Sequence, residues 1–562
     1  MNTIDRPAHP GRGGHARSTQ KGRVADEAAL QEIAALIGDG AWQRDLLIEY
    51  LHVIQDHYGC ISARHLAALA EHLRIGLAEA YETATFYAHF DVVKEDSTPV
   101  APLTIRICDS IGCAMAGAEA LLADLKKTAP KNIRIQRVPC IGQCAEAPAA
   151  VVGTKVVVHA SSQKLTSCAD SGEHRADEKS PPDYTTYSAH GGYELYQAIC
   201  SGKLPADHAL DVIEASGLRG MGGAGFPTAR KWRAVKSAAG IKYLVINADE
   251  GEPGTFKDRF ILEHDPHRVL EGALMAATII GANEIYFYLR DEYAGLRAML
   301  TREIAKLPAD GPRIHLRRGA GSYVCGEESA LIESLEGKRG YPRQRPPLPV
   351  ESGLFGRPTA TNNVETLFFL RDILERGAEW WRAQGRKGGI GLRHYSVSGR
   401  VKNPGVKLAP AGLTLHDLLQ DYCGGMADGH ELLAYLPGGA SGGIMPARLS
   451  HVPLDFGALE PHGCFIGSAA IIVLSQHDDL KSAARNLMAF FADESCGQCT
   501  PCRLGTAKSL KLMQAEHWDV PLLKDLAEVM RDASICGLGQ AAPNPVQSLL
   551  RYFPHLFEGD QA

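Results

Sequence analysis

Long apolar runs are missing from this sequence. Its longest, such as AAIIVL from Ala469, fall far short of the ~20 residues that cross a bilayer, so we expect no membrane span. A basic block is also missing, because 59 Lys and Arg residues are interspersed with 65 Asp and Glu, for a net charge of -6. Proteins that bind nucleic acids or membrane surfaces usually carry a basic face or block. We therefore expect no nucleic-acid partner and no membrane partner.

The amino-terminal stretch MNTIDRPAHPGRGGHARSTQKGR lacks an apolar core. We therefore expect it to be disordered rather than a secretory signal, and we predict a cytoplasmic protein. Thiols stay reduced in the cytoplasm, so the 14 cysteines indicate metal ligands rather than disulfides. Histidine is not expected to contribute, since the sequence lacks HExxH and HxxxH patterns.

Three cysteines follow at intervals of three in ESCGQCTPCRLG, which begins at Glu494. A zinc site usually takes two CxxC or CxxH pairs from separate turns, whereas a cubane cluster accepts three ligands from one CxxCxxC loop and a distant fourth. The spacing of Cys496, Cys499 and Cys502 therefore favours a [4Fe-4S] cluster. Cys536, in SICGLGQ between two helix-like stretches, is the predicted fourth ligand.

A second set of four cysteines lies on two loops of a small α/β unit. LTIRIC predicts a strand that leads into a turn with Cys108 and Cys113, and NIRIQRV predicts a strand that leads to Cys140 and Cys144. Two pairs on neighbouring loops can bind the two irons of a [2Fe-2S] cluster, one pair to each iron. The alternatives are a zinc site and buried free thiols. Zinc pairs are normally spaced close to CxxC, and neither pair here is, so the spacing favours the cluster.

A glycine-rich loop, GLRGMGGAGFPTARKW, opens the large domain. Gly220, Gly222 and Gly225 match GxGxxG, but a helical stretch precedes the loop and the strand KYLVIN follows it. The loop therefore lacks the context of a standard dinucleotide fingerprint. Its backbone N–H groups can still bind a phosphate, with Lys231 as countercharge. The alternative is a merely flexible loop.

Acidic and amide side chains follow in NADEGEPGTFKDR, GSYVCGEESALIESLEGKRG and TNNVET. The first segment places Asn247, Asp249, Glu250 and Glu252 after a strand, where ligands of open α/β sheets bind. Their oxygens suit ribose or ribityl hydroxyls. Each segment alone is better explained as a solvated acidic loop, and only their joint presence favours a nucleotide site.

These segments, with GGAGFPTARKW, CGEESALIESLEGKRG, ESCGQCTPCRLGT and CGLGQ, resemble the 51 kDa-type flavoprotein subunit of NADH:quinone oxidoreductase, from about Tyr193 onward. The second cysteine set, with ETATFYAHF before it, resembles the 24 kDa-type partner of that subunit. Fusions of the two resemble diaphorase subunits of soluble NAD-dependent formate dehydrogenases and NAD-reducing hydrogenases. The stretches ETATFYAHFDVVKE, YSVSGRVKNPGVKLAPAGLTL and AYLPGGASGG look closest to the beta subunit of molybdenum- or tungsten-dependent formate dehydrogenase.

The resemblance implies an FMN site and an NAD(H) site. The residues implied for FMN are Gly220, Gly222, Gly223, Lys231, Asn247, Asp249, Glu250, Tyr323, Gly326, Glu327, Asn362, Asn363 and Thr366. Those implied for NAD(H) are Phe226, Glu252, Glu328 and Arg345. No catalytic residue is implied beyond the flavin, which Glu252 and Glu328 are expected to tune. Met221 stands where the family usually has Arg and Leu348 where it often has Phe, so we expect weaker or differently posed NAD.

The same resemblance implies an oxidoreductase with FMN, NAD, one [4Fe-4S] cluster and one [2Fe-2S] cluster. We predict the diaphorase subunit of an NAD-dependent formate dehydrogenase, which passes electrons from formate oxidation through the [4Fe-4S] cluster and FMN to NAD+. The [2Fe-2S] cluster would be a side store. NAD(H) exchanges two electrons as hydride and clusters exchange one, so a flavin must stand between them.

A partner subunit is expected because no residues here suggest a molybdopterin site. We predict a catalytic alpha subunit that carries molybdopterin, with Mo or W, and further iron-sulfur clusters. The alternatives are the diaphorase subunit of an NAD-reducing hydrogenase or of a respiratory NADH:quinone oxidoreductase. A zinc-bound scaffold that binds nucleotides without redox turnover is a further alternative.

The predicted fold is multidomain α/β, since single cores stop growing well below this length. Its seven parts are a disordered tail (1–25), a helical bundle (26–95), a thioredoxin-like [2Fe-2S] domain (96–166), a linker (167–192), a Rossmann-like FMN/NAD-binding α/β domain (193–392), a ubiquitin-like β-grasp insert (393–478) and a helical [4Fe-4S] domain (479–562). The linker is predicted from its Ser, Asp, Glu and Pro content. The resemblance supplies the domain types.

Overall fold

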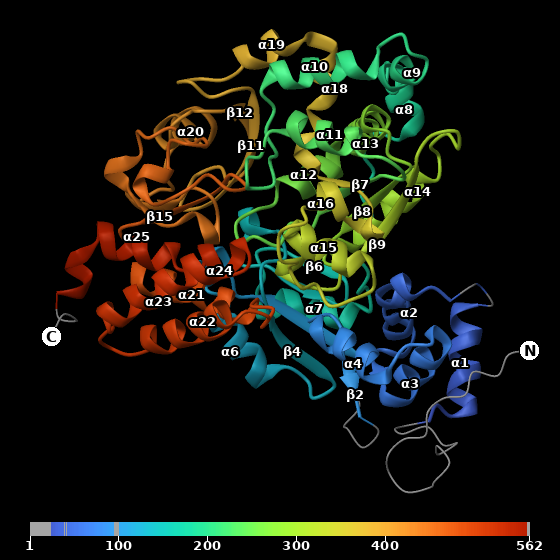
Figure 1. Cartoon of the computed structure of the whole chain (residues 1–562). Coiled ribbons are helices and arrows are strands. Elements are labelled where there is room, and N and C mark those ends of the chain that lie inside the picture. Colours follow the sequence, from blue (N-terminus) through green and yellow to red (C-terminus); the bar gives the residue numbers. More distant parts are fainter. Residues whose placement is uncertain (1–23, 39, 41, 95–99, 559–562) are drawn as a thin grey trace, which may run out of the picture. The chain divides into compact units, whose positions relative to one another are not determined.

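The computed structural model describes residues 24–38, 40, 42–94 and 100–558 (Figure 1). The predicted disordered tail lies outside these residues except for its last two positions. The chain forms two compact units. Of the described residues, those from 24 to 85 and from 90 to 94 form one unit, and those at 86–89 and 100–558 form the other.

The first unit is helical, in agreement with the predicted bundle. Its elements are α1 (Glu27–Ile37), η1 (Arg44–Leu46), α2 (Leu47–Tyr58), β1 (Ile61–Ser62), α3 (Ala63–Leu73), α4 (Leu77–Phe86) and β2 (Val92–Val93). Ser62 caps the amino end of α3, because its hydroxyl accepts a hydrogen bond from His65 N at 3.2 Å. Leu47, Leu51 and Ile54 recur at helical spacing on α2 and are fully buried, so burial of one apolar face holds this helix in place.

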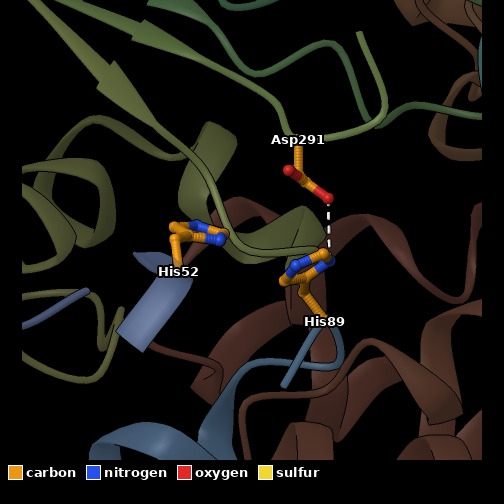
Figure 2. Close-up of side chains that lie close together, drawn as sticks. All are labelled: His52, His89 and Asp291. Carbon is orange, nitrogen blue, oxygen red and sulfur yellow. Dashed lines mark ion pairs between the residues drawn. The ribbon is translucent and has the colours of Figure 1, made fainter. Parts of the chain in front are cut away.

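Residues Phe86–His89 belong to the second unit. Tyr87 Oη donates a hydrogen bond to the carbonyl of Lys338 at 2.7 Å. Figure 2 shows His89 beside Asp291, with 2.7 Å between His89 Nδ1 and Asp291 Oδ2. Side-chain contacts thus attach this short segment to the α/β domain.

A four-stranded sheet of order β4-β3-β5-β6 carries the first group of cysteines. The elements of this region are β3 (Leu103–Cys108), α5 (Ile111–Met115), α6 (Ala118–Thr128), β4 (Ile133–Val138), η2 (Cys144–Glu146), β5 (Ala150–Val152), β6 (Lys155–Val157) and α7 (Ser162–Ser171). Strands β3 and β4 are parallel, while β5 and β6 form a hairpin through Gly153, whose φ of 63° favours glycine. The two strands predicted from LTIRIC and NIRIQRV are therefore present.

The predicted linker, 167–192, contains regular structure. It includes the end of α7 and all of α8 (Tyr184–Ala189). Tyr184 N donates to Glu303 Oε2 at 3.2 Å, and Tyr187 Oη donates to Glu271 Oε2 at 2.6 Å. The segment was predicted to be a linker because its composition is polar. It also contains two tyrosines, however, and these attach it to the next domain.

An all-parallel sheet of order β10-β7-β8-β9 forms the centre of the largest domain. Its strands are β7 (Tyr243–Ala248), β8 (Glu284–Leu289), β9 (Arg313–Arg318) and β10 (Thr359–Asn363). The helices of the domain are α9 (Glu194–Cys200), α10 (Ala206–Ser216), α11 (Thr228–Ser237), α12 (Lys257–His264), α13 (Pro266–Ile280), α14 (Ala294–Ile304), η3 (Tyr323–Gly326), α15 (Glu328–Leu335), α16 (Pro349–Ser352), η4 (Leu354–Gly356), α17 (Val364–Phe368), α18 (Leu370–Arg376) and α19 (Ala378–Ala383). The apolar run in β8 is buried along its length, as parallel strands covered on both faces require.

A five-stranded sheet of order β12-β11-β15-β13-β14 forms the next domain. Its region contains β11 (Leu392–Gly399), β12 (Gly405–Pro410), α20 (Leu415–Tyr422), β13 (Leu432–Leu436), η5 (Ala440–Gly442), β14 (Met445–Pro446), η6 (Ala447–Leu449), η7 (Glu460–His462) and β15 (Ala470–Ser475). Strands β11 and β12 are antiparallel, and the last strand, β15, lies parallel to β11. Two strands are thus followed by a helix, while the ubiquitin-like assignment stays a prediction.

Helices form the last part of the described chain. They are α21 (Leu480–Asp493), α22 (Thr500–Met513), α23 (Val520–Ala533), α24 (Gly537–Ala541), α25 (Asn544–Tyr552) and η8 (Pro554–Phe557). Trp518 and Phe557 pack with ring centroids 5.3 Å apart, which ties the loop before α23 to η8. None of the helices in the described part of the chain has the length and apolar character that a bilayer crossing needs.

Candidate functional site

A cavity of about 360 Å³ lies at the carboxyl ends of β7 and β10 in the second unit. The residues that line it are Gly222, Gly223, Ala224, Asn247, Asp249, Glu250, Gly251, Glu252, Thr255, Lys257, Asp258, Tyr323, Val324, Gly326, Glu327, Asn363, Gly438, Ser441, Phe465, Gly467, Ser468, Gly537, Leu538 and Ala541. Open parallel sheets bind ligands at this edge. The position of the cavity therefore agrees with the site expected from the sequence.

The predicted FMN and NAD residues fall into two groups. Those that line the cavity are Gly222, Gly223, Asn247, Asp249, Glu250, Glu252, Tyr323, Gly326, Glu327 and Asn363. Those outside the lining are Gly220, Phe226, Lys231, Glu328, Arg345, Asn362 and Thr366. The sequence thus located the cavity, and the binding role of each residue stays a prediction.

Several residues of the second group support the wall from behind. Thr366 Oγ1 accepts a hydrogen bond from Met221 N at 2.9 Å, which fixes the glycine loop. Arg345 forms ion pairs with Glu327 at 2.7 Å and with Glu328 at 2.9 Å, so it is tied to a residue of the lining. These contacts give both residues a place beside the site without lining it.

Sequence reasoning did not single out the other lining residues, some of which lie in the segments already named. They are Ala224, Gly251, Thr255, Lys257, Asp258, Val324, Gly438, Ser441, Phe465, Gly467, Ser468, Gly537, Leu538 and Ala541. Ser441 N donates a hydrogen bond to Glu252 Oε1 at 2.7 Å, and Thr255 Oγ1 lies 2.6 Å from Ser468 Oγ. The domain of the five-stranded sheet therefore closes one side of the cavity. The glycines of AYLPGGASGG were the signal that could have identified this wall.

The cavity has features that suit a flavin nucleotide. Asp249 Oδ2 is buried and has no hydrogen-bond partner among the described residues, as expected of an oxygen that awaits a ligand hydroxyl. Gly223 has a φ of 132°, which side chains disfavour, and a Cβ at Gly222 would lie 3.1 Å from the Cβ of Asn363. The loop therefore favours glycine at position 223 through its φ and at position 222 through close packing, and a backbone without side chains suits a phosphate.

The Asp249 carboxyl is expected to make stability depend on pH. Burial raises its pKa to about 8, from an ordinary value of 3.8. The pKa of Asp249 is higher in the folded protein than in the unfolded chain. The protonated carboxyl therefore contributes its full stabilisation below pH 3.8, and this contribution is lost as the pH rises toward 8. Asp249→Asn should therefore stabilise the flavin-free protein by about 1–3 kcal/mol above pH 8, and by less at pH 5, where only part of the loss has occurred.

Thermal unfolding of the flavin-free protein at pH 5 and at pH 9 measures this effect. Asp525→Asn is the matched control, since Asp525 is exposed on α23 and its replacement should change the melting temperature little at either pH. An equal gain for Asp249→Asn at both pH values would contradict the assignment of a buried carboxylate.

A buried group of charges lies beside the cavity. Lys257 is 1% exposed, and its Nζ lies 2.7 Å from Asp258 Oδ1 and 3.1 Å from Glu365 Oε2. Glu365 also accepts hydrogen bonds from the backbone and ring of His394, at 2.6 and 3.0 Å. Burial alone would raise the pKa of Glu365, but Lys257 and His394 outweigh it and lower that pKa to about 2. Lys257 therefore helps to keep Glu365 ionised, whereas at Asp258 burial outweighs the lysine and raises the pKa of the carboxyl.

The first cysteine set is brought together as predicted. Cys108, Cys113, Cys140 and Cys144 are all buried, and the Sγ atoms of Cys140 and Cys144 lie 3.2 Å apart. Hydrogen bonding from Cys113 raises the pKa of Cys108, whereas hydrogen bonds from Cys108 and Cys144 lower that of Cys140. Four crowded thiols on two neighbouring loops fit the ligand set of a [2Fe-2S] cluster.

The second cysteine set is also assembled. Burial raises the pKa of Cys502 and of Cys536 to about 11, and the charge of Cys496 adds to both shifts. A Cβ at Gly539 would lie 2.8 Å from the Cβ of Cys502, so α24 packs directly against the loop of three cysteines. The position of Cys536 beside that loop fits a [4Fe-4S] cluster.

Three known family patterns match the chain. The pattern described as Nuo51 FMN-binding domain covers residues 213–372, and NADH-ubiquinone oxidoreductase-F iron-sulfur binding region covers 482–560. Thioredoxin-like [2Fe-2S] ferredoxin covers 33–171. The predicted FMN, NAD, [2Fe-2S] and [4Fe-4S] cofactors are thereby confirmed.

Curated relatives and solved structures extend these matches. An F-type subunit of NADH-quinone oxidoreductase in Rhizobium meliloti (strain 1021) is 40% identical over 388 residues, which span 66% of this chain and 92% of that protein. The F-type subunit of the same enzyme in Rickettsia typhi (strain ATCC VR-144 / Wilmington) is 41% identical, across 62% of this chain and 87% of its own. A chain of NAD+-reducing [NiFe]-hydrogenase in the H2-reduced state is 33% identical with a TM-score of 0.81, and the match covers 93% of this chain and 94% of that one.

Proposed function

This chain belongs to the family of F-type subunits of NADH-quinone oxidoreductase, and we propose that it exchanges electrons between NAD(H) and a partner subunit, as a diaphorase. It differs from the curated relatives by also carrying the thioredoxin-like [2Fe-2S] region, so the 24 kDa and 51 kDa types are fused in one chain. A flavin can take two electrons from NADH and release them singly to clusters. A flavin site beside iron-sulfur clusters is therefore the arrangement that this exchange requires.

One observation carries this proposal: both cysteine sets are connected to the same cavity. Gly537 and Leu538, which directly follow Cys536, line the cavity. Arg290 donates hydrogen bonds both to the carbonyl of Glu250, a lining residue, and to the carbonyl of Cys140, the latter at 2.7 Å. A ligand in the cavity would thus be connected through neighbouring residues to both predicted iron-sulfur sites.

The chain's own residues are proposed to bind and orient the two nucleotides. The glycine loop would hold the flavin phosphate, and Asn247, Asp249 and Glu250 its ribityl and ring system. Glu252, which Tyr323 Oη and Ser441 hold from both sides, would face NAD(H) and tune the flavin through its charge. Phe226 is 44% exposed and so remains available to stack on a base of NAD(H).

We also propose that the chain is divided into the domains predicted from its sequence. The boundaries predicted from the sequence are supported by the separate sheets of residues 103–157, 243–363 and 392–475. The ubiquitin-like insert is supported by its hairpin, its helix and the parallel pair β11 and β15. An excised insert that unfolds cooperatively on its own would support this assignment.

The partner is proposed to be a separate catalytic subunit. Likeness over almost the whole fused chain supports the diaphorase of an NAD-reducing hydrogenase more strongly than the other candidates. The formate dehydrogenase assignment, with a partner that carries molybdopterin and Mo or W, is supported by the three sequence stretches that resemble its beta subunit. A respiratory partner is supported by the curated relatives.

Purification of the native complex tests the function and the partner separately. We expect this chain, once separated from its partner, to be brown, to contain FMN with two irons in one cluster and four in the other, and to be bleached by NADH. A colourless protein, or one without FMN, would contradict the proposed diaphorase. NAD+ reduction assayed with H2 and with formate then identifies the partner, since only the matching donor should support turnover.

A further inference from the structure

Arg290 joins the cavity wall to the loop of the first cysteine set. It follows β8 and is 4% exposed. One guanidinium nitrogen donates to the carbonyl of Glu250, and the other donates to the carbonyl of Cys140 at 2.7 Å. The planar fork of arginine is suited to two such bonds, which a lysine cannot make with the same geometry.

Further contacts hold the same cysteine loop. Arg259 Nε donates to the carbonyl of Gly142 at 3.0 Å, and Gly142 N lies 3.4 Å from Cys140 Sγ. Gly142 has a φ of 76°, and a Cβ there would lie 2.4 Å from the hydroxyl of Tyr293. The loop therefore fits closely against the flavin domain, and a side chain at position 142 would force Tyr293 to move.

Arg290 also brings charge to this loop. Its guanidinium is paired with Glu292, at 2.9 Å from Nη2 to Oε1, and Glu292 is more exposed than the arginine. A buried positive charge acts strongly because the surrounding dielectric is low. An added electron on a cluster held by Cys140 would be stabilised by Arg290 and disfavoured by Glu292.

We propose that Arg290 is a positioning residue that raises the reduction potential of the [2Fe-2S] cluster and connects its Cys140 ligand to the flavin cavity. The proposal rests on the diaphorase function above. The transfer that Arg290 favours moves one electron from the reduced flavin to the cluster, so one negative charge is lost at the cavity and gained at the cysteine loop. Arg290 keeps its protons throughout, and no bond to it forms or breaks. Hydrogen bonding and nearby charge are recognised means by which a protein sets cluster potentials.

A redox titration of the purified full chain, followed by EPR, tests this proposal. Arg290→Gln should lower the [2Fe-2S] midpoint and decrease its reduced-to-oxidised ratio about tenfold at a fixed potential, which is about 59 mV for one electron. Glu292→Gln should shift the same midpoint upward, because it leaves the arginine charge unpaired. Arg290→Lys keeps the positive charge, so its [2Fe-2S] midpoint should lie closer to that of the unmodified protein than the midpoint of Arg290→Gln does.

The controls separate this effect from a general disturbance. The [4Fe-4S] midpoint should stay unchanged in every variant. Arg302→Gln removes the same charge from the same domain, at a residue 44% exposed on α14 that pairs with Glu178, and should leave both midpoints unchanged.

The possible results either support or overturn the proposal. If Arg290→Gln cannot assemble the cluster, an upward shift in Glu292→Gln still supports it. An unchanged midpoint in Glu292→Gln, or equal shifts in Arg290→Lys and Arg290→Gln, would overturn it. Absence of a [2Fe-2S] signal from the unmodified protein would instead overturn the proposed function.

Discussion

Replacing Cys536 with alanine is expected to stop electron exchange with the partner while sparing the reaction of NADH with the flavin. Cys536 is the predicted fourth ligand of the [4Fe-4S] cluster, and α24, which begins at the next residue, packs on Cys502. Loss of an outer-shell partner alone costs about 10- to 100-fold, so loss of this ligand should decrease NAD+ reduction by the native donor at least ~100-fold.

The same preparation supplies the comparison. NADH oxidation with ferricyanide, which accepts electrons from the flavin directly, should stay within about threefold, since Cys536 itself is absent from the cavity lining. Cys200→Ala is the matched control, because Cys200 is exposed and outside both ligand sets. Full activity with the native donor in Cys536→Ala would show that electrons take another route.

Replacing Lys257 with methionine is expected to destabilise the flavin domain severely. The change leaves the buried carboxylates of Asp258 and Glu365 without their shared cation. Breaking a buried ion pair by removing one partner costs about 3–5 kcal/mol. FMN should also be lost, because Lys257 and Asp258 line the cavity. Denaturant unfolding followed by flavin release measures both effects.

A surface lysine provides the control for this variant. Lys236 pairs with Asp207 at 2.5 Å, but that aspartate is 80% exposed, so Lys236→Met should cost less than about 1 kcal/mol. The difference between Lys257→Met and the unmodified protein should narrow as pH falls from 4.5 toward 2. The reason is that the lowered pKa of Glu365 contributes stability only while that carboxyl is ionised. If Lys257→Met and Lys236→Met lowered the free energy of unfolding by similar amounts, that result would contradict a buried charge network around Lys257.

Sequence spacing predicted the parts of the site whose residues are close together in the chain. Cys496, Cys499 and Cys502 lie on one loop, and their interval alone indicated the type of cluster. The alternation of LTIRIC and the apolar run of KYLVIN predicted β3 and β7, because period and composition are local properties. The acids after β7 were correctly placed for the same reason.

Long-range packing could not be predicted in this way. Arg290 contacts Cys140 across 150 positions, and no local pattern distinguishes it from other arginines. Ser441 and Phe465 reach the cavity only because the domain of the five-stranded sheet packs beside the all-parallel sheet. The tyrosines of the predicted linker also show this limit, since a polar composition does not reveal two aromatic anchors.

The cavity wall extends from Gly222 to Ala541, almost to the end of the described chain. Domains generally fold in order as the ribosome releases them. The parallel sheet and the glycine loop therefore emerge long before Phe465 and Leu538 exist to close the remaining sides. Flavin loading should accordingly be a late step of biogenesis, and a stalled nascent chain that ends before the last helices should be unable to retain the cofactor.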